Sequence, residues 1–209
     1  MKIVHIIFFS SLFILFAPGL IAQEEPDKRN VWTGGQSGYV VYGSLAELKG
    51  QTTFNILVNP VIPQMGAAYE PDSVYVAKRV SEWNAERKGK GDQWLSYWND
   101  SKANFKPVFI AGMNEKLSKA GVVIGPDDFD SEYTMILQTK HMMEFMGAIY
   151  VVQDIYVVKT EEYSDTVAHV RCPVNTSNMG GEYSNSNYEM AYFTTGAKFA
   201  KYLSKTVFK

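Results

Sequence analysis

Cysteine is almost absent from this sequence, which limits how the chain can be stabilised covalently. Cys172 is the only cysteine among 209 residues, so an intramolecular disulfide is impossible. An intermolecular bridge and a reactive thiol remain open as functions for it. A free cysteine is more often a small buried hydrophobic side chain, and we expect Cys172 to lie on a strand in the core.

Histidine is scarce as well, and this removes most histidine-based catalysis. Of the three histidines, only His141 and His169 lie outside the hydrophobic N-terminal segment. His169 and Cys172 are three residues apart on a predicted strand, so their side chains should face opposite sides and cannot form a thiol–base pair. The G-x-S-x-G, H-E-x-x-H and glycine-rich phosphate-binding motifs are missing. We therefore expect neither an enzyme nor a cofactor-binding protein.

The sequence also lacks an excess of positive charge. It has 20 Lys and Arg against 22 Asp and Glu, for a net charge of −2 at pH 7. Such a chain offers no basic field to a phosphate backbone, so we expect no nucleic-acid partner. Beyond the first 22 residues no apolar run approaches the length of a transmembrane helix, so no membrane span is expected once this segment is removed.

Residues 1–22 have the features of a secretory signal peptide. Lys2 provides a basic start, residues 3–17 are almost entirely apolar, and Ala22 precedes a polar stretch. This pattern predicts cleavage after Ala22, although an uncleaved anchor remains the alternative. No cysteine lies near the cleavage site, which argues against a lipid-anchored protein. We expect an exported protein in the periplasm, at the cell surface or in the medium.

The remaining chain predicts a leader and one domain. Residues 23–42 begin acidic, become glycine-rich and predict a flexible leader, whereas residues 43–209 show no repeat and no second boundary. Alternating apolar residues predict four strands, over residues 52–59, 132–140, 148–160 and 166–174.

Apolar residues three or four apart predict several helices between residues 71 and 121, and a last helix over residues 188–203. A glycine pair at Gly89 and Gly91 should end the first helix, and Pro107 should lie in the first turn of a later one. Together the elements predict an α+β fold, in which helices pack on one face of a mostly antiparallel sheet. Both sides of the strand over residues 148–160 are apolar, which indicates cover on both sides or a partner surface.

Two segments are candidate metal sites. Asp127, Asp128 and Asp130 are hard oxygen ligands that suit calcium, but they lack the complete pattern of a calcium-binding hand and also fit a solvated turn. His141, Met142 and Met143 combine imidazole with thioethers, which suits Cu(I). Methionines between strands more often fill gaps in the packing, and metal binding is therefore the less favoured hypothesis.

Aromatic residues near the glycine pair form a third candidate site. Trp94 and Trp98 are four residues apart on one helical face, with Tyr97 beside them. Exposed rings with polar neighbours could stack on the sugar rings of a glycan. The alternative is a helix that packs its tryptophans into the core.

Four short motifs resemble a group of small exported proteins of uncharacterised function from Bacteroidota. They are Ser-Leu-Ala-Glu-Leu-Lys-Gly-Gln at residues 44–51, Gly-Lys-Gly-Asp-Gln-Trp at residues 89–94, Phe-Lys-Pro-Val-Phe at residues 105–109, and Glu-Tyr-Thr-Met-Ile at residues 132–136. The resemblance implies a leading strand, a run of helices and then strands. It implies no catalytic residues.

These features favour a non-catalytic envelope or secreted protein that binds a protein or an envelope polymer, or serves as a structural accessory. The main alternative is a glycan-binding module that uses Trp94, Tyr97 and Trp98. A hydrolase that uses a carboxylate pair such as Asp127 and Asp130 as acid and base is a further alternative, since carboxylates are common and need no special motif.

Overall fold

Three long strands from the second half of the chain form the centre of the sheet. The computed structural model describes residues 38–125, 130–145, 148–176 and 186–209. Strands β4 (Tyr133–Phe145), β5 (Ala148–Lys159) and β6 (Glu162–Thr176) pair antiparallel in chain order. Strand β5 is rich in Val, Ile and Tyr, residues that favour an extended backbone, and its pairing with β4 and β6 extends the order to those two strands.

Shorter strands from the first half of the chain complete the sheet on both sides. Strand β1 (Tyr39–Gly43) pairs antiparallel with β6, while β2 (Thr53–Asn59) lies parallel to both β4 and β3 (Val123–Gly125). The strand order is β1-β6-β5-β4-β2-β3. Three of the five neighbouring pairs are antiparallel, which confirms the predicted α+β fold with a mostly antiparallel sheet.

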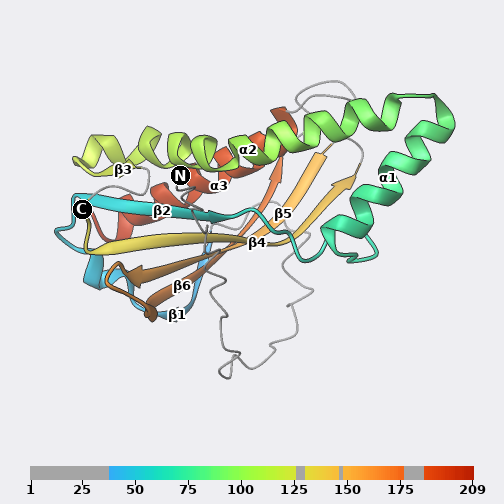
Figure 1. The fold of residues 1–209 in the computed structure, drawn as a ribbon. Helices are drawn as coiled ribbons and strands as arrows, with labels where there is room; N and C mark the ends of the chain where they lie inside the picture. The colour runs from blue at the N-terminus through green and yellow to red at the C-terminus, as the bar shows by residue number, and fades with distance from the viewer. Residues whose placement is uncertain (1–37, 126–129, 146–147, 177–185) are drawn as a thin grey trace, which may run out of the picture.

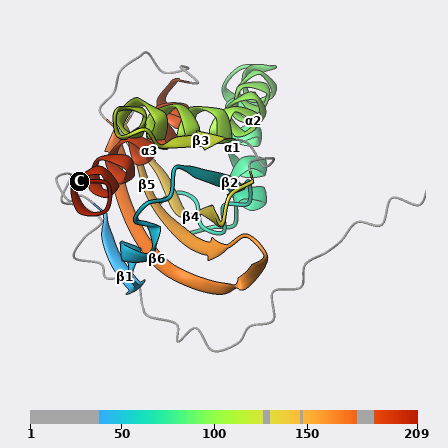
Figure 2. The same ribbon diagram turned by 90° about the vertical axis from the view of Figure 1, so that its left-hand side faces the viewer.

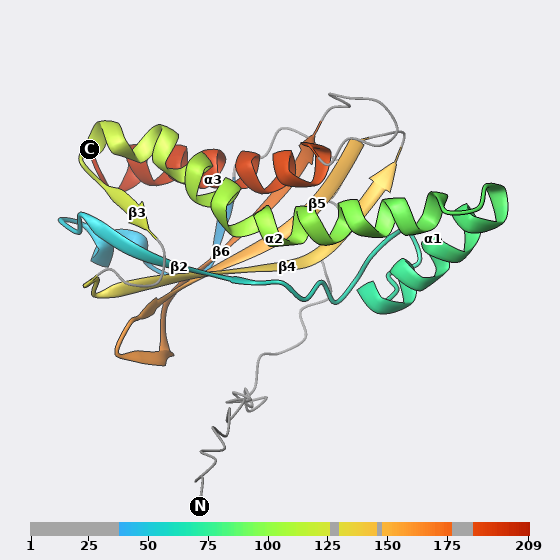
Figure 3. The same ribbon diagram turned by 45° about the horizontal axis from the view of Figure 1, so that its top comes forward.

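Helices α2 (Lys90–Leu117) and α3 (Ser186–Thr206) lie side by side on one face of the sheet (Figures 1 and 2). Helix α1 (Asp72–Glu86) packs beside the first half of α2, at the far end of the molecule from the C-terminus (Figure 3). Two short 3-10 helices, η1 (Leu45–Leu48) and η2 (Ser118–Ala120), join the elements. No helix in the described part of the chain is long and apolar enough to cross a membrane.

The core lies between this helical layer and the sheet. Phe105 of α2 stacks on Tyr192 of α3, with ring centroids 3.8 Å apart, and both side chains are fully buried. Strand β2 contributes Phe54 and Ile56 to the same core, and both side chains are fully buried. The helices are thus attached to the sheet by the apolar side chains that were predicted to form their inner faces.

Helix α2 differs from its prediction because it is one continuous helix. The sequence predicted a separate helix with Pro107 in its first turn, whereas Pro107 lies inside α2. A proline at this position removes one backbone hydrogen bond. Phe105 and Phe109 on either side are fully buried, and their tertiary packing stabilises the helix through this point.

The predicted start of the domain was also wrong by a few residues. Tyr39–Gly43 forms the edge strand β1, although residues 39–42 were predicted to belong to the flexible leader. The Tyr and Val residues of this segment favour a strand, and pairing with β6 provides the backbone hydrogen bonds that order it directly after the glycine-rich stretch. The predicted signal peptide and the leader up to residue 37 lie outside the described residues and stay predictions.

Strand β5 has two very different sides. Ile149, Val151 and Ile155 point towards the helices and are buried in the core. Tyr150, Val152 and Tyr156 alternate with them, point to the opposite side and are half-buried. None of the helices of the described residues lies on that side, which we call the helix-free face.

Candidate functional site

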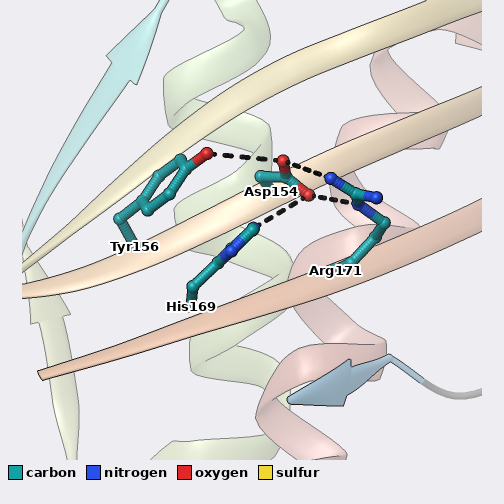
Figure 4. Close-up of polar contacts among 4 residues, drawn as sticks. All are labelled: Asp154, Tyr156, His169 and Arg171. Atoms are coloured by element: carbon teal, nitrogen blue, oxygen red, sulfur yellow. Dashed lines mark hydrogen bonds and ion pairs between the residues drawn. The ribbon is translucent and has the colours of Figure 1, made fainter. Parts of the chain in front are cut away.

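A buried carboxylate is the most unusual feature of the helix-free face. Asp154 lies in the middle of β5 and is 0% exposed. Arg171 on β6 donates from Nε to Oδ1 at 2.8 Å and from Nη2 to Oδ2 at 3.1 Å. His169 Nε2 lies 3.2 Å from Oδ1, and the Tyr156 hydroxyl donates to Oδ2 at 3.4 Å. Figure 4 shows the four side chains, which we call the Asp154 cluster, in front of the strands with helices behind.

The register of two strands assembles this cluster. Asp154 is directly opposite Arg171, and Tyr156 is directly opposite His169. Residues that face each other across neighbouring strands share one side of the sheet. The Tyr156 and His169 rings consequently stack, with centroids 4.4 Å apart and planes 17° apart. The Asp154–Arg171 contact is a bidentate ion pair, the geometry in which arginine binds carboxylates most strongly.

The electrostatics fix the protonation of most of the cluster at neutral pH. Burial pushes the pKa of Asp154 upward, but hydrogen bonds from His169 and Arg171 outweigh it and hold that pKa below its usual value. Burial, aided by the nearby Asp154 charge, raises the pKa of Tyr156 to about 12. The hydrogen bond to Asp154 raises the pKa of Arg171 further above its usual value. Asp154 and Arg171 are therefore both charged, and their charges cancel locally.

The structure confirms that His169 and Cys172 face opposite sides of β6. His169 belongs to the helix-free face, whereas Cys172 is buried in the core beneath the helices. Burial raises the pKa of the Cys172 thiol to about 12. The two side chains thus form no nucleophile–base pair, and Cys172 is the small buried hydrophobic side chain that was expected.

Cys172 should be inert towards thiol reagents in the folded protein. Its pKa lies far above about pH 8, the pH of a standard thiol assay, and only the thiolate reacts. Ellman's reagent should therefore label native protein at a small fraction of the rate seen in denaturant. Labelling at equal rates in both conditions would contradict the burial of this thiol.

The copper candidates do not converge on one point. His141 faces the helix-free side, where its Nε2 donates to the Gly66 carbonyl at 2.9 Å, while Met142 is buried in the core. Burial lowers the pKa of His141, and this hydrogen bond partly opposes the shift. Met143 is directly opposite Tyr150 on the helix-free side. Strand alternation therefore separates Met142 from the other two ligands.

The acidic candidates are described only in part. Asp127 and Asp128 lie outside the described residues, and Asp130 is exposed. Within the ranges that the structure describes, no three His, Cys, Asp or Glu side chains are grouped so that they could hold a metal ion. Calcium binding by this segment stays a prediction.

The hypothesis that Trp94 and Trp98 of α2 form an exposed aromatic platform is wrong. Trp94 and Trp98 are 4% and 2% exposed and stack on each other with centroids 6.0 Å apart. Trp98 also makes an edge contact with Tyr188 of α3. Tyr97 is half-buried and its hydroxyl accepts a hydrogen bond from Gln93. The tryptophans face inward because Trp98 packs on Tyr188 of α3 and Trp94 packs on Trp83 of α1. Trp94 and Trp98 therefore offer no exposed pair of rings to a sugar.

The sequence did contain a signal for the Asp154 cluster. Asp154 is the only charged residue between Ile149 and Val158, in a strand that is otherwise apolar apart from Gln153. A carboxylate at such a position needs a charged or hydrogen-bonding partner. Arg171 lies on the next predicted strand and was the obvious candidate, but the pairing depends on a register that the sequence alone does not give.

Comparisons with known proteins found distant structural similarity alone. No family model matches it, and no curated protein matches it significantly. Among solved structures, a PelC variant from Paraburkholderia phytofirmans, described as a dodecamer, is 9% identical, with a TM-score of 0.37 over 78% of this chain and 97% of that one. Protein XCC0632 from Xanthomonas campestris, of a family described as DUF330, is 8% identical, with a TM-score of 0.34 over 73% and 83%. Similarities this low do not assign a function.

Proposed function

We propose that this chain is an exported, non-catalytic protein of the cell envelope or the medium that binds a macromolecular partner through its helix-free face. The observation that carries the proposal is the Asp154 cluster, a prearranged set of charged and aromatic side chains on the side of the sheet without helices. The export part of the proposal depends on the signal-peptide features of residues 1–22.

The distribution of side chains supports a binding role for this face. A sheet face that meets only water normally carries small or flexible polar side chains in alternation with the core residues. Here Tyr150, Val152 and Tyr156 are half-buried along β5. Rigid aromatic side chains and arginine are the residue types enriched in interfaces. Holding a charged residue still before binding also reduces the entropy that association costs.

The state of the reactive groups supports a non-catalytic role. The Cys172 thiol is buried and protonated at neutral pH, as its raised pKa shows. Both oxygens of Asp154 accept hydrogen bonds from Arg171, and the carboxylate is fully buried, so it makes no direct contact with solvent. The Nε2 atom of His141 is hydrogen-bonded to the backbone carbonyl of Gly66. The burial and the hydrogen bonds of these groups are typical of structural residues, which supports the proposed non-catalytic role.

A photo-crosslinking residue on each side of the sheet tests the proposal. Tyr150 lies on the helix-free face and Tyr97 on α2, and both are half-buried tyrosines. With p-benzoylphenylalanine at position 150, irradiation in envelope extract of the source cells should produce one dominant adduct, because crosslinking needs a partner within contact distance. The same residue at position 97 is the matched control and should produce little. Adducts from position 97 but none from position 150 would refute the proposal.

A further inference from the structure

The helix-free face carries two parallel rows of side chains that cross five strands. In each row, every residue is directly opposite the next one on the neighbouring strand, so all members point to the same side. The first, the apolar row, consists of Tyr42, His169, Tyr156, Ile136 and Leu57. The second, the polar row, consists of Tyr39, Arg171, Asp154, Gln138 and Asn59. Each row runs across β1, β6, β5, β4 and β2.

Together the rows form a track with one apolar and one hydrogen-bonding side. Since neighbouring strands lie about 4.8 Å apart, the track extends about 19 Å across the sheet. All members are half-buried apart from Asp154, which is fully buried, and Tyr42, which is 64% exposed. The track therefore offers a partner its Tyr and His rings, the amides of Gln138 and Asn59, and the guanidinium of Arg171.

The charges of the track favour a neutral partner. Arg171 and Asp154 are its only members with a fixed charge, and they neutralise each other through two hydrogen bonds. A nucleic acid or another polyanion would need several uncompensated cations, and a polycation would need accessible carboxylates. Asp154 is not accessible. The track has the complementarity expected for a neutral polymer.

The position of the track, in the middle of the sheet face, disfavours an extended peptide as the partner. Peptides that add to a sheet do so at an edge strand, where free backbone groups form hydrogen bonds. Within the face, the backbone groups of β4, β5 and β6 are used by their own pairing. Only side chains remain to recognise a partner. They offer apolar contact from one row and hydrogen bonds from the other, the combination that ligand sites use.

We infer that the helix-free face binds an extended neutral polysaccharide along this track. This inference rests on the proposed function and specifies the class of partner. The C–H faces of the sugar rings would pack on the apolar row, and their hydroxyl groups would exchange hydrogen bonds with the polar row. A second observation lies at the same face. Tyr69 has the backbone angle φ of 56°, which is strained for a bulky residue, and it stacks on His141 with centroids 4.4 Å apart. The strained loop thus holds one more exposed ring on the side where the track lies, as functional sites often do.

Calorimetric titration tests this inference. The neutral probes are cellohexaose, maltohexaose, xylohexaose and the neutral polysaccharide fraction of the source cells' own envelope, and the charged probes are an oligogalacturonate and a glucosamine hexamer. At least one neutral probe should bind. Tyr42→Ala and Gln138→Ala should each weaken that binding about tenfold, as the loss of an interface hot spot does. Tyr97→Ala is the control on the helical layer and should bind like the wild type.

The outcomes separate this inference from the proposal on which it rests. Binding of charged probes only, or of no probe, overturns the inference, and so does a loss of affinity confined to Tyr97→Ala. If position 150 still crosslinks to a protein while no neutral probe binds, the proposed function stands and the saccharide inference fails. Tyr42 lies on the exposed edge strand, so an unchanged melting curve of Tyr42→Ala would show that weaker binding is not a loss of folding.

Discussion

Asp154→Ala should lower the free energy of unfolding by about 3 kcal/mol, because it breaks a buried ion pair and leaves one partner uncompensated. The carboxylate is fully buried and accepts two hydrogen bonds from Arg171. The side chain of Arg171 is 21% exposed, so water can partly solvate it, and we expect the lower end of the range for buried pairs. For a domain of this size the melting temperature should fall by about 6–12 °C. Chemical denaturation of wild type and variant measures the effect, and equal m-values for the two proteins would show that only stability has changed.

Two control variants make this prediction specific to the buried pair. Asp165→Ala removes a carboxylate that pairs with Lys159 at 3.2 Å, and both side chains are 45% exposed. It should leave the unfolding curve nearly unchanged, because exposed pairs contribute little. The double variant Asp154→Leu with Arg171→Met should recover much of the stability that Asp154→Ala loses, since an apolar pair needs no compensating charge. Equal effects of Asp154→Ala and Asp165→Ala would contradict the account of the cluster.

The same carboxylate predicts a dependence of stability on pH. Its pKa in the folded protein lies below that in the unfolded chain, so its contribution is complete above the unfolded value of about 3.9 and is lost as the pH falls through the lower, folded value. Asp154→Asn should remove that part of the acid-induced loss of stability. The difference between wild type and variant should therefore shrink towards low pH.

Gly112→Ala should destabilise the protein by about 2 kcal/mol or more, because helices α2 and α3 touch at this residue. A Cβ added at Gly112 would lie 2.2 Å from the Phe193 carbonyl oxygen, and one at Gly196 would lie 2.4 Å from that of Phe109. Both obstacles are backbone atoms, which cannot rotate away as a side chain can. The two helices would have to separate, and the stacked Phe105 and Tyr192 rings beneath them would lose contact.

Helix propensity predicts the opposite sign, which makes this test decisive. In an exposed helix interior, alanine is more favourable than glycine by about 1 kcal/mol. The neighbouring Ala111 is exposed on the same helix, so Ala111→Gly measures that propensity in this context and should be mildly destabilising. If Gly112→Ala instead raised the melting temperature, the close approach of α2 and α3 would be wrong.

Local sequence patterns predicted most elements of the fold. β5 is rich in Val, Ile and Tyr, β4 and β6 alternate buried with more exposed residues over much of their length, and the apolar stripe of α3 has helical spacing. Each of these elements was therefore recognisable on its own. The opposed positions of His169 and Cys172 followed from strand alternation alone. Edge strand β1 was missed because its strand-favouring Tyr and Val residues directly follow a glycine-rich stretch, and a strand of five residues is ordered only by its pairing with β6.

The candidate site was harder to predict because it depends on register. Asp154 and Arg171 are 17 residues apart in the chain, and a one-residue shift between β5 and β6 would place them on opposite sides of the sheet. The orientation of Trp94 and Trp98 depends in the same way on how α2 packs against α3. Sequence periodicity groups such side chains on one face of a helix, but only the tertiary contact decides whether that face is buried or exposed.

The two sides of the sheet differ in the side chains that they carry. The helical side contains the core and the glycine contact between α2 and α3, and its large aromatic residues stabilise the fold. The helix-free face contains the Asp154 cluster and the two rows, and we assign binding to it. Mutations on the first side should therefore act through stability, whereas exposed positions on the second should change binding alone.

Hydroxyl-radical footprinting tests this division most directly, because it needs no variant and no identified partner. The oxidation of Tyr42, which is 64% exposed, is compared between purified protein and protein in isolated envelope of the source cells. Tyr97 and Tyr202, half-buried on the helical layer, are the references. We predict that Tyr42 becomes protected in the envelope while both references oxidise at unchanged rates. Protection of Tyr97 and Tyr202 with Tyr42 still fully reactive would contradict the assignment of binding to the helix-free face.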